Sequence, residues 1–371
     1  MREGWEYKKL GEIINVRTGK LDANASSEDG QYPFFTCSRE PLRISSYSYD
    51  CECVLVAGNG DLNVKYYNGK FDAYQRTYII TLKEGITETS VPYLYKFFTS
   101  HIEVLRQRSI GGIIKYIKLG DIANTILPLP PLSMQETIVS ELDKINELIR
   151  LKKGQLKDYD NLAMSIFYEM FGDPVVNEKG WEIKKLGEVA MIKTGPFGSM
   201  LHKEDYIADG IPLINPMHIQ NFKAVPDKYF TISKEKAAEL CNYQLKINDV
   251  IFARRGDIGR CAVISDKEEG YLCGTGSLFV RFERKLSSIY TMYVVRTTSF
   301  IKELVSKAKG ATMLNLNSST MENLRFPIPP LPLQQHFAQR IELIEQQKAE
   351  IQSTIADLET LLASRMQYWF D

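Results

Sequence analysis

The sequence predicts an α+β fold of two tandem-duplicated, β-rich globular domains, each followed by a long helix. The duplication is visible twice: GWEYKKLGE at Gly4 recurs as GWEIKKLGE at Gly180, and LPLPPLSMQE at Leu127 recurs as FPIPPLPLQQ at Phe326. Between residues 4–19 and 180–195, ten of sixteen positions are identical. An apolar seam after each proline run predicts that the two helices pair as an antiparallel coiled coil with pseudo-two-fold symmetry.

The repeat sets the domain boundaries. We place the first globular domain at residues 1–127, a central long helix at 128–174, the second globular domain at 175–325 and a distal long helix at 326–371. Short runs rich in Val, Ile, Tyr and Phe, separated by turn residues, predict strands in both globular parts. Asn68-Gly69, between VKYY and KFDAY, predicts a β-hairpin turn.

Composition is that of a globular protein. The chain has 371 residues, of which 44% are hydrophobic and 25% charged, which suits two domains of ordinary size. No apolar run approaches the roughly 18 residues that span a bilayer, and the first residues lack the apolar core of a signal peptide, so we expect a cytoplasmic protein. Six cysteines without a CxxC pair and four dispersed histidines predict free thiols and no metal site.

Each proline run is expected to start a helix. Ser133 and Glu136 have the spacing of a capping box, and Pro332 suits a first helical turn. Steps of four and three residues then follow an apolar seam for four to five heptads, over a predicted length of about 50 to 55 Å. A surface helix packed on its own domain could carry such a stripe, but two helices of equal length favour pairing with each other. The seam residues are Ile138, Leu142, Ile145, Ile149 and Leu156 in the first helix, and Ile341, Ile344, Ile351, Ile355 and Leu358 in the second.

Charge differs between the globular and helical parts. The formal net charge is zero, yet residues 1–127 hold 16 basic against 15 acidic residues and residues 175–325 hold 22 against 17. The two helical segments together hold 8 basic against 14 acidic residues. Weakly basic domains permit nucleic-acid binding, and the acidic helices are then available to protein partners.

Catalytic motifs are missing from the sequence. It has no phosphate-binding GxxxxGK[ST] loop, no HExxH and no EF-hand loop. LPPL and IPPL carry leucine where an amino-methylating enzyme needs an aromatic residue. Asp173, Glu182 and Lys184 have nuclease-like spacing, but the last two belong to the duplicated GWExKK, whose first copy has no matching carboxylate. We therefore expect no catalytic residue and no metal in this chain.

The whole pattern resembles the specificity subunit of type I restriction-modification systems. The resemblance rests on residues 5–12 with their copy at 181–188, on TGPFGSMLHKEDY, on ARRGDIG and on the two PPLxxQ helix starts. It implies two target-recognition domains held by antiparallel helices, no catalytic activity and no cofactor in this chain. It further implies double-stranded DNA and two adenine-methylating subunits with S-adenosylmethionine as partners and, in a restricting complex, two translocase-nuclease subunits that use ATP and Mg²⁺.

A tandem pair of diverged domains is expected to read two different half-sites of a bipartite, asymmetric DNA target. The helices would set the length of the unread spacer and dock the methylating subunits. Two alternatives stay open: the targeting subunit of a modification-only or type IIB-like system, and a coiled-coil scaffold that binds protein.

DNA-contacting residues are predicted from chemistry, because Arg fits guanine edges, Asn and Gln fit adenine, and Lys commonly contacts phosphate. Glycine-bracketed loops are favoured because they let the backbone approach a ligand closely. The predicted residues are Arg39, Arg43, Lys65, Lys70 and Arg76 in the first domain, and Lys193, Ser199, His218, Arg254 and Arg255 in the second.

Overall fold

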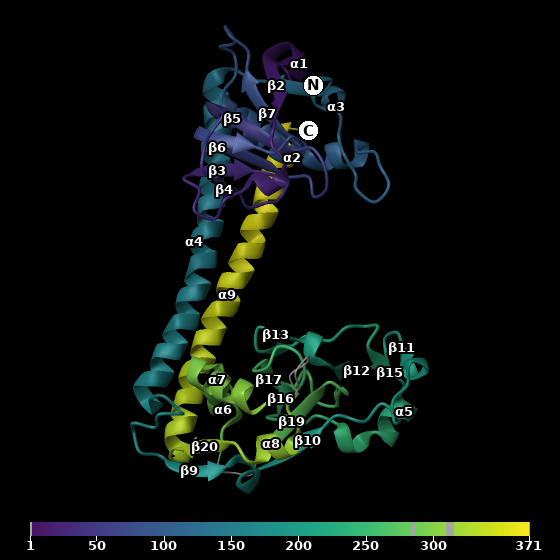
Figure 1. The fold of residues 1–371 in the computed structure, drawn as a ribbon, viewed down its shortest axis with the longest axis vertical. Helices are drawn as coiled ribbons and strands as arrows, with labels where there is room; N and C mark the ends of the chain where they lie inside the picture. The colour runs from purple at the N-terminus through teal and green to yellow at the C-terminus, as the bar shows by residue number, and fades with distance from the viewer. Residues whose placement is uncertain (1, 283–285, 309–314, 371) are drawn as a thin grey trace. The chain divides into compact units, whose positions relative to one another are not determined.

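The structure is a computed structural model that describes residues 2–282, 286–308 and 315–370. Its contacts divide the chain into two units (Figure 1). Unit 1 comprises Met1–Gly154 with Ile351–Asp371, and unit 2 comprises Gln155–Glu350. Each unit therefore contains one globular domain and one segment of each long helix, which agrees with the expected α+β fold of two tandem domains.

Unit 1 is built on a six-stranded sheet in the order β2-β7-β5-β6-β3-β4. All neighbours are antiparallel except β3 and β6, which pair in parallel. A separate antiparallel pair joins β1 to β8 and brings the two ends of the globular domain together. The strands are β1 (Glu6–Lys9), β2 (Ile14–Thr18), β3 (Tyr32–Phe35), β4 (Leu42–Ile44), β5 (Tyr49–Ala57), β6 (Val64–Ala73), β7 (Thr77–Leu82) and β8 (Ile126–Leu129).

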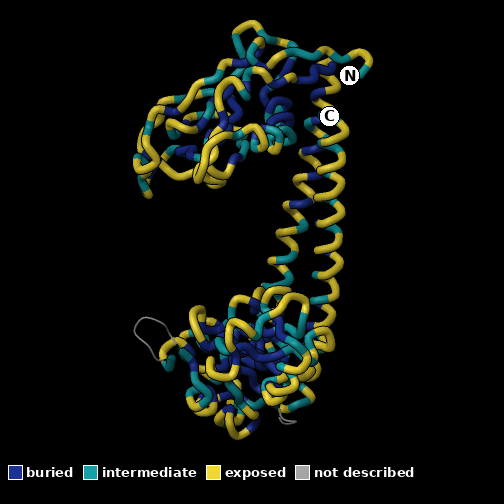
Figure 2. Tube along the Cα trace, turned by 90° about the vertical axis from the view of Figure 1, so that its right-hand side faces the viewer, coloured by how far each residue is buried: buried dark blue, intermediate teal, exposed yellow. Residues whose placement is uncertain are grey.

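Helix α2 (Val91–Arg108) supplies much of the unit 1 core. Ser90 caps its first turn, accepting a hydrogen bond from the backbone N–H of Tyr93 at 3.4 Å. Phe97 and Phe98 are fully buried, in one cluster with Val54 and Val56 of β5. Buried segments gather in the interior of each globular domain (Figure 2). The short helices of this unit are α1 (Leu10–Ile13), α3 (Leu119–Ala123) and a 3-10 turn η1 (Ala23–Ala25).

Unit 2 repeats the central strands with smaller sheets around them. One sheet has the order β10-β19-β16-β17, a second the order β11-β15-β12-β18, and β13 pairs with β14 and β9 with β20. The strands are β9 (Glu182–Lys185), β10 (Ala190–Thr194), β11 (Tyr206–Ile207), β12 (Ile211–Ile214), β13 (Ile219–Gln220), β14 (Lys223–Ala224), β15 (Thr231–Ile232), β16 (Val250–Ala253), β17 (Cys261–Val263), β18 (Leu272–Cys273), β19 (Ser277–Phe282) and β20 (Arg325–Ile328).

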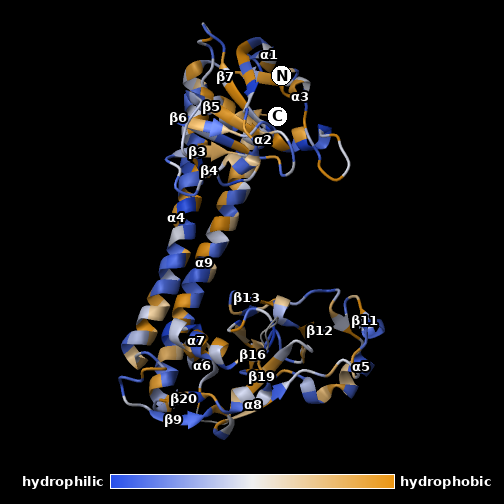
Figure 3. Ribbon diagram, viewed as in Figure 1, coloured by the Kyte–Doolittle hydropathy of each residue, from blue (hydrophilic) through white to orange (hydrophobic). Residues whose placement is uncertain are grey.

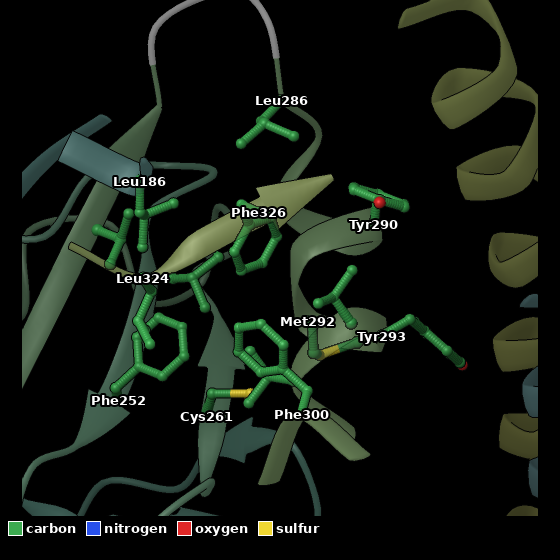
Figure 4. Packing of buried hydrophobic residues seen from close by; sticks show 14 of the residues in the cluster. Leu186, Phe252, Cys261, Leu286, Tyr290, Met292, Tyr293, Phe300, Leu324 and Phe326 are labelled. Carbon is green, nitrogen blue, oxygen red and sulfur yellow. The ribbon is translucent and has the colours of Figure 1, made fainter. Parts of the chain in front are cut away.

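Aromatic side chains fill the unit 2 core. Figure 4 shows three phenylalanines that point toward one another between the strands and the helices: Phe252 of β16, Phe300 of α7 and Phe326 of β20. The rings of Phe300 and Phe326 lie 5.1 Å apart, edge to face. The helices are α5 (Lys234–Glu239), α6 (Ser288–Arg296), α7 (Thr298–Lys307) and α8 (Ser318–Glu322), with 3-10 turns η2 (Leu186–Glu188), η3 (Lys203–Asp205), η4 (Pro216–His218) and η5 (Cys241–Tyr243).

The two long helices, α4 (Leu132–Phe171) and α9 (Leu331–Phe370), have 40 residues each, which corresponds to about 60 Å. In unit 1, Arg365 donates to Glu141 at 3.0 Å and Lys153 to Glu359 at 2.7 Å, so the helices run antiparallel there. In unit 2, Lys348 donates to Asp160 at 2.9 Å, again between antiparallel segments. No helix among the described residues is long and apolar enough to cross a membrane.

Apolar residues of both long helices pack into the core clusters of the two units. Hydrophobic and hydrophilic residues alternate along both helices (Figure 3). Of the ten predicted seam residues, two, Leu156 and Leu358, are partly buried. The other eight are buried, namely Ile138, Leu142, Ile145, Ile149, Ile341, Ile344, Ile351 and Ile355.

Both helix starts use the same buried glutamine. Gln135 Nε2 donates to the carbonyl oxygens of Pro130 at 2.9 Å and Glu88 at 2.7 Å. Gln334 Nε2 donates to the Pro329 carbonyl at 2.7 Å. Both glutamines are fully buried, and each satisfies the carbonyl of a buried proline, which cannot bond to water. This explains why the PPLxxQ motif ends in Gln.

Two local predictions were wrong. Asn68-Gly69 is not a hairpin turn, because both residues lie inside β6 and pair in continuous register with Glu52 and Cys51 of β5. Ser133 is not a helix cap, because α4 already begins at Leu132. At Asn68-Gly69 the pairing with β5 overrides a local signal. At Ser133 the helix starts earlier, because the backbone N–H groups of Met134 and Gln135 already bond to the Pro131 carbonyl. Pro332 does lie in the first turn of α9, as predicted.

Candidate nucleic-acid interface

The same strand ends meet in both units. In unit 1, Thr18 at the end of β2 pairs with Tyr78, and Ala57 at the end of β5 pairs with Thr77. In unit 2, Thr194 pairs with Leu278 and Ala253 with Ser277. We call the loops at these strand ends the loop edge: residues 19–22, 36–40, 58–63 and 74–76 in unit 1, and 195–201, 215–218, 254–260 and 274–276 in unit 2.

Equivalent backbone hydrogen bonds hold both loop edges. The N–H of Gly19 donates to the Thr77 carbonyl at 3.1 Å, and the N–H of Gly195 to the Ser277 carbonyl at 3.0 Å. The next strand repeats the arrangement, with Gly58 N–H bonded to the Arg76 carbonyl at 2.8 Å and Arg254 N–H to the Gly276 carbonyl at 3.1 Å.

Glycine is required at the first of these contacts. A Cβ at Gly19 would lie 2.0 Å from the carbonyl oxygen of Ala73, and one at Gly195 would lie 1.9 Å from that of Gly274. No side chain fits at such distances. The repeated Thr-Gly pair therefore fixes the backbone of the loop edge in both units.

Arg39 and Arg76 lie on the loop edge of unit 1, and Lys65 lies beside it near the start of β6. Arg39 forms an ion pair with Asp61 at 2.9 Å, and the Arg39 guanidinium holds the pKa of that carboxyl below its usual value. Lys65 donates to Asn63, whose amide donates to the Cys37 carbonyl at 2.8 Å. Desolvation lowers the pKa of Lys65.

Arg76 of this group is exposed in the turn before β7. It adds a basic side chain next to the backbone contact that its own carbonyl makes with Gly58.

Arg43 and Lys70 lie elsewhere in unit 1. Arg43 donates to the Gly30 carbonyl at 2.9 Å. The ammonium group of Lys70 lies 4.7 Å from the ring centre of Tyr47, whose hydroxyl raises the pKa of Lys70. The Tyr47 ring packs 4.9 Å from Tyr32, so these residues form a second exposed group of aromatic and basic side chains.

In unit 2, Lys193, Ser199 and Arg255 reach the loop edge. Ser199 and Arg255 are exposed. Lys193 lies 5.0 Å from the ring centre of Tyr243. The Tyr243 hydroxyl contacts the Met200 sulfur at 3.6 Å. This contact connects β10 to the loop that carries Ser199.

His218 and Arg254 are buried rather than presented to a ligand. His218 is 3% exposed, lies 2.9 Å from the Leu213 carbonyl through Nδ1 and packs on Phe230. Arg254 is 9% exposed and donates from Nε to Asn315 at 3.2 Å. Burial is the main cause that lowers the pKa of Arg254, and the neighbouring Arg255 adds to it. Both residues support the loop edge from beneath.

Selection by charge missed the exposed apolar side chains of these loops. In unit 2, Phe197 is 67% exposed and Met217 is 54% exposed. Their loops meet at the segment 274–276, where a Cβ on Gly276 would lie 2.8 Å from Pro216. In unit 1, Ile113 and Ile114 are exposed beside the loop edge. An apolar residue inside a glycine-rich segment was the available signal.

The described residues contain no group of three or more His, Cys, Asp or Glu side chains that could hold a metal ion. The loop edge is thus a surface of arginine, lysine, hydroxyl and apolar groups on a fixed backbone. Such a surface can donate hydrogen bonds to phosphates and to base edges.

Comparison with known proteins identifies the family. Residues 2–158 and 178–359 each match the type I restriction modification DNA specificity domain. The type I restriction enzyme EcoDI specificity subunit of Escherichia coli is 29% identical over 364 residues, covering 91% of this chain and 80% of that protein. A putative type I specificity subunit of Haemophilus influenzae is 25% identical over 361 residues, covering 92% and 87%.

Two solved structures share the fold. The S subunit of a type I restriction-modification system from M. genitalium superimposes with a TM-score of 0.58 at 14% identity, covering 99% of this chain and 96% of that chain. A second chain comes from structures that describe complex assembly and conformational transition of the type I restriction-modification system. It has a TM-score of 0.62 at 19% identity, covering 100% of this chain and 98% of that chain. With one specificity domain in each half of its sequence, the chain belongs to the family of type I restriction-modification DNA specificity subunits.

Proposed function

We propose that the two units read the two unlike halves of one bipartite, asymmetric DNA site. The observation that carries this proposal is the repeated loop edge: the backbone contacts are equivalent in both units, whereas the side chains on them differ. Unit 1 carries Arg39 and Arg76 at its loop edge, whereas unit 2 carries Lys193, Ser199 and Arg255. A symmetric dimer recognises a palindrome because its two surfaces are identical. Two units with the same backbone contacts and different side chains would instead recognise two different half-sites.

The recognition domains in this proposal are residues 1–127 and 175–325, and the helical segments 128–174 and 326–371 set the spacer between the half-sites. The antiparallel helix segments seen within each unit support a pseudo-two-fold arrangement, in which each domain approaches the duplex in the reverse sense of the other. The helical segments are acidic overall, which suits docking of two adenine-methylating subunits. Two translocase-nuclease subunits complete a restricting complex.

The chain itself has no catalytic role in this proposal. S-adenosylmethionine, ATP and Mg²⁺ belong to the partner subunits. The alternative of a modification-only or type IIB-like system shares the same recognition role and differs in its partners. The alternative of a protein-binding scaffold predicts no salt-sensitive affinity for DNA and no partner-dependent methylation.

The test is to co-express the chain with its cognate methylating subunit and to map methylated adenines across the host genome at base resolution. We expect one gapped motif with two unlike half-sites, and no methylation when either protein is expressed alone. A stable complex that methylates no adenine would contradict the proposal. The purified chain alone should turn over neither S-adenosylmethionine, ATP nor DNA.

A further inference from the structure

The segment between α2 and α3 projects from unit 1 and carries apolar side chains at its tip (Figure 3). Ile113 is fully exposed, at 104%, and Ile114 is 62% exposed. Isoleucine is among the residues most often buried in proteins. Two adjacent isoleucines held in water therefore indicate a surface that a ligand covers.

The tip is held in a defined shape. Ile110 and Tyr116 exchange two backbone hydrogen bonds, at 2.9 and 2.8 Å. Between them Gly111 has a φ of +120°, and a Cβ there would lie 2.5 Å from the Ile114 carbonyl oxygen. A turn closed in this way presents Ile113 and Ile114 in advance of binding, which reduces the entropy cost of association.

The turn is attached to the loop edge. The N–H of Ile117 donates to the Gly58 carbonyl at 3.0 Å, and the N–H of Gly60 donates to the Lys115 carbonyl at 3.0 Å. The loop that these bonds hold also contains Asp61, which pairs with Arg39. The two isoleucines therefore stand beside the predicted DNA-contacting residues of unit 1.

The charge of the segment favours a polyanion. Between Glu103 and Asp121 the sequence contains four basic residues and no acidic one: Arg106, Arg108, Lys115 and Lys118. Arg106 is paired with Asp61 and Glu103, whereas Arg108, Lys115 and Lys118 are exposed. A small apolar tip flanked by cations is the combination with which proteins enter a DNA groove and separate adjacent base pairs.

We propose that Ile113 and Ile114 form a wedge that inserts between base steps of the half-site read by unit 1. The inference rests on the DNA-reading function proposed above and adds a second kind of specificity to it. Pyrimidine–purine steps unstack most easily. Unit 1 then discriminates at such a step without a hydrogen bond to either base.

The experiment uses the full chain in complex with its methylating subunits. The probes are 40-base-pair duplexes that carry the mapped motif, with 2-aminopurine placed in turn at each adenine of both halves. The wild-type complex, I113S/I114S and I113M/I114L are compared by fluorescence and by affinity over a range of salt. Val176→Ser, at an apolar residue of unit 2 that is 73% exposed, is the matched control.

Methylating subunits extrude their target adenines from the duplex, so a rise at those positions is expected with every variant. With wild-type protein we expect a further several-fold rise of 2-aminopurine fluorescence at one other step, in one half-site only. I113S/I114S should lose that rise and bind about tenfold more weakly, with an unchanged dependence of affinity on salt because no charge is removed. I113M/I114L should restore both properties, since the wedge needs apolar bulk. Val176→Ser should behave as wild type.

Three results would overturn the wedge while leaving DNA recognition intact. These are specific binding without a fluorescence rise outside the target adenines, serine variants that bind and unstack like wild type, and serine variants that lose the methylating subunits but keep their DNA affinity. The last result would assign the tip to protein docking. If the mapping finds no motif, the proposed function fails, and the wedge fails with it.

Discussion

Gln135 and Gln334 show how one residue connects a proline run to a helix. Each is fully buried and donates to the carbonyl of a buried proline just before the helix, Pro130 or Pro329. A leucine or alanine at this position would leave those carbonyls unsatisfied in the core. The cost of an unsatisfied buried polar group is about 1–3 kcal/mol.

Gln135→Ala is therefore expected to lower the free energy of unfolding by about 1–3 kcal/mol. The adjacent Glu136 is exposed, so Glu136→Ala serves as the control and should change little. Denaturant unfolding followed by circular dichroism measures both. Equal stability of the two variants would show that the carbonyls of Glu88 and Pro130 find other donors.

The candidate site was only partly predictable from single residues. Arg39, Arg76 and Arg255 were chosen as arginines in or near turns, and the structure exposes them there. Arg254 had the same signal as its neighbour Arg255, yet alternation along the chain turns it inward to Asn315. Ile113 and Ile114 were missed because an apolar residue predicts a core position unless the tertiary structure is known.

The long helices were predictable because their pattern is long. A seam repeated over several heptads averages out local exceptions, and eight of its ten predicted residues are buried. The Asn68-Gly69 signal failed because it covers two residues only, whereas eight residues of β5 pair continuously with β6 across it. Pairing partners far away in sequence are not visible to local rules.

Gly154 lies in the interior of α4, where glycine costs about 1 kcal/mol relative to alanine. A Cβ there meets no atom within 4 Å. Gly154→Ala should therefore raise the free energy of unfolding by about 0.5–1 kcal/mol. Gly60→Ala is the contrasting variant, because Gly60 has a φ of +69° and alanine should destabilise there. A stabilising effect in both variants would contradict this account.

The pair of Glu141 and Arg365 predicts a pH-dependent contribution to stability. The hydrogen bond from Arg365 lowers the pKa of Glu141 below its ordinary value of 4.5. A carboxyl with a lowered folded-state pKa stabilises the protein above the unfolded-state pKa, and this stabilisation is lost as pH falls through the folded-state value.

Glu141→Gln should therefore melt below wild type at pH 7, and the difference should shrink as pH falls below about 4.5. Calorimetry across this range measures it, with Glu136→Gln as control. A deficit that stays constant down to about pH 3 would indicate a packing effect of the glutamine rather than loss of the ion pair.

For the molecule as a whole, two recognition units predict effects confined to one half-site. Arg255→Ala should relax the methylated motif in one half by about 1–3 kcal/mol of discrimination per affected base and leave the other half unchanged. Arg39→Ala should relax the opposite half. Methylation mapping with each variant measures both. Relaxation of both halves by one substitution would contradict separate reading.

The duplicated fold was predictable from the whole sequence, whereas the identity of the half-sites was not. Repeated motifs such as GWExKKLGE indicate that both units share the same backbone arrangement. The side chains on the frame differ, and their geometry depends on loops that no repeat constrains.

The backbone-only contacts of the loop edge also bear on how new specificities can arise. Bonds such as Gly19 N–H to Thr77 C=O involve no side chain of the residues that face outward. Substitutions on that surface therefore carry little penalty in folding, and many variants remain viable while their preferred bases change. New DNA specificities can therefore evolve by point mutation while the backbone scaffold stays the same.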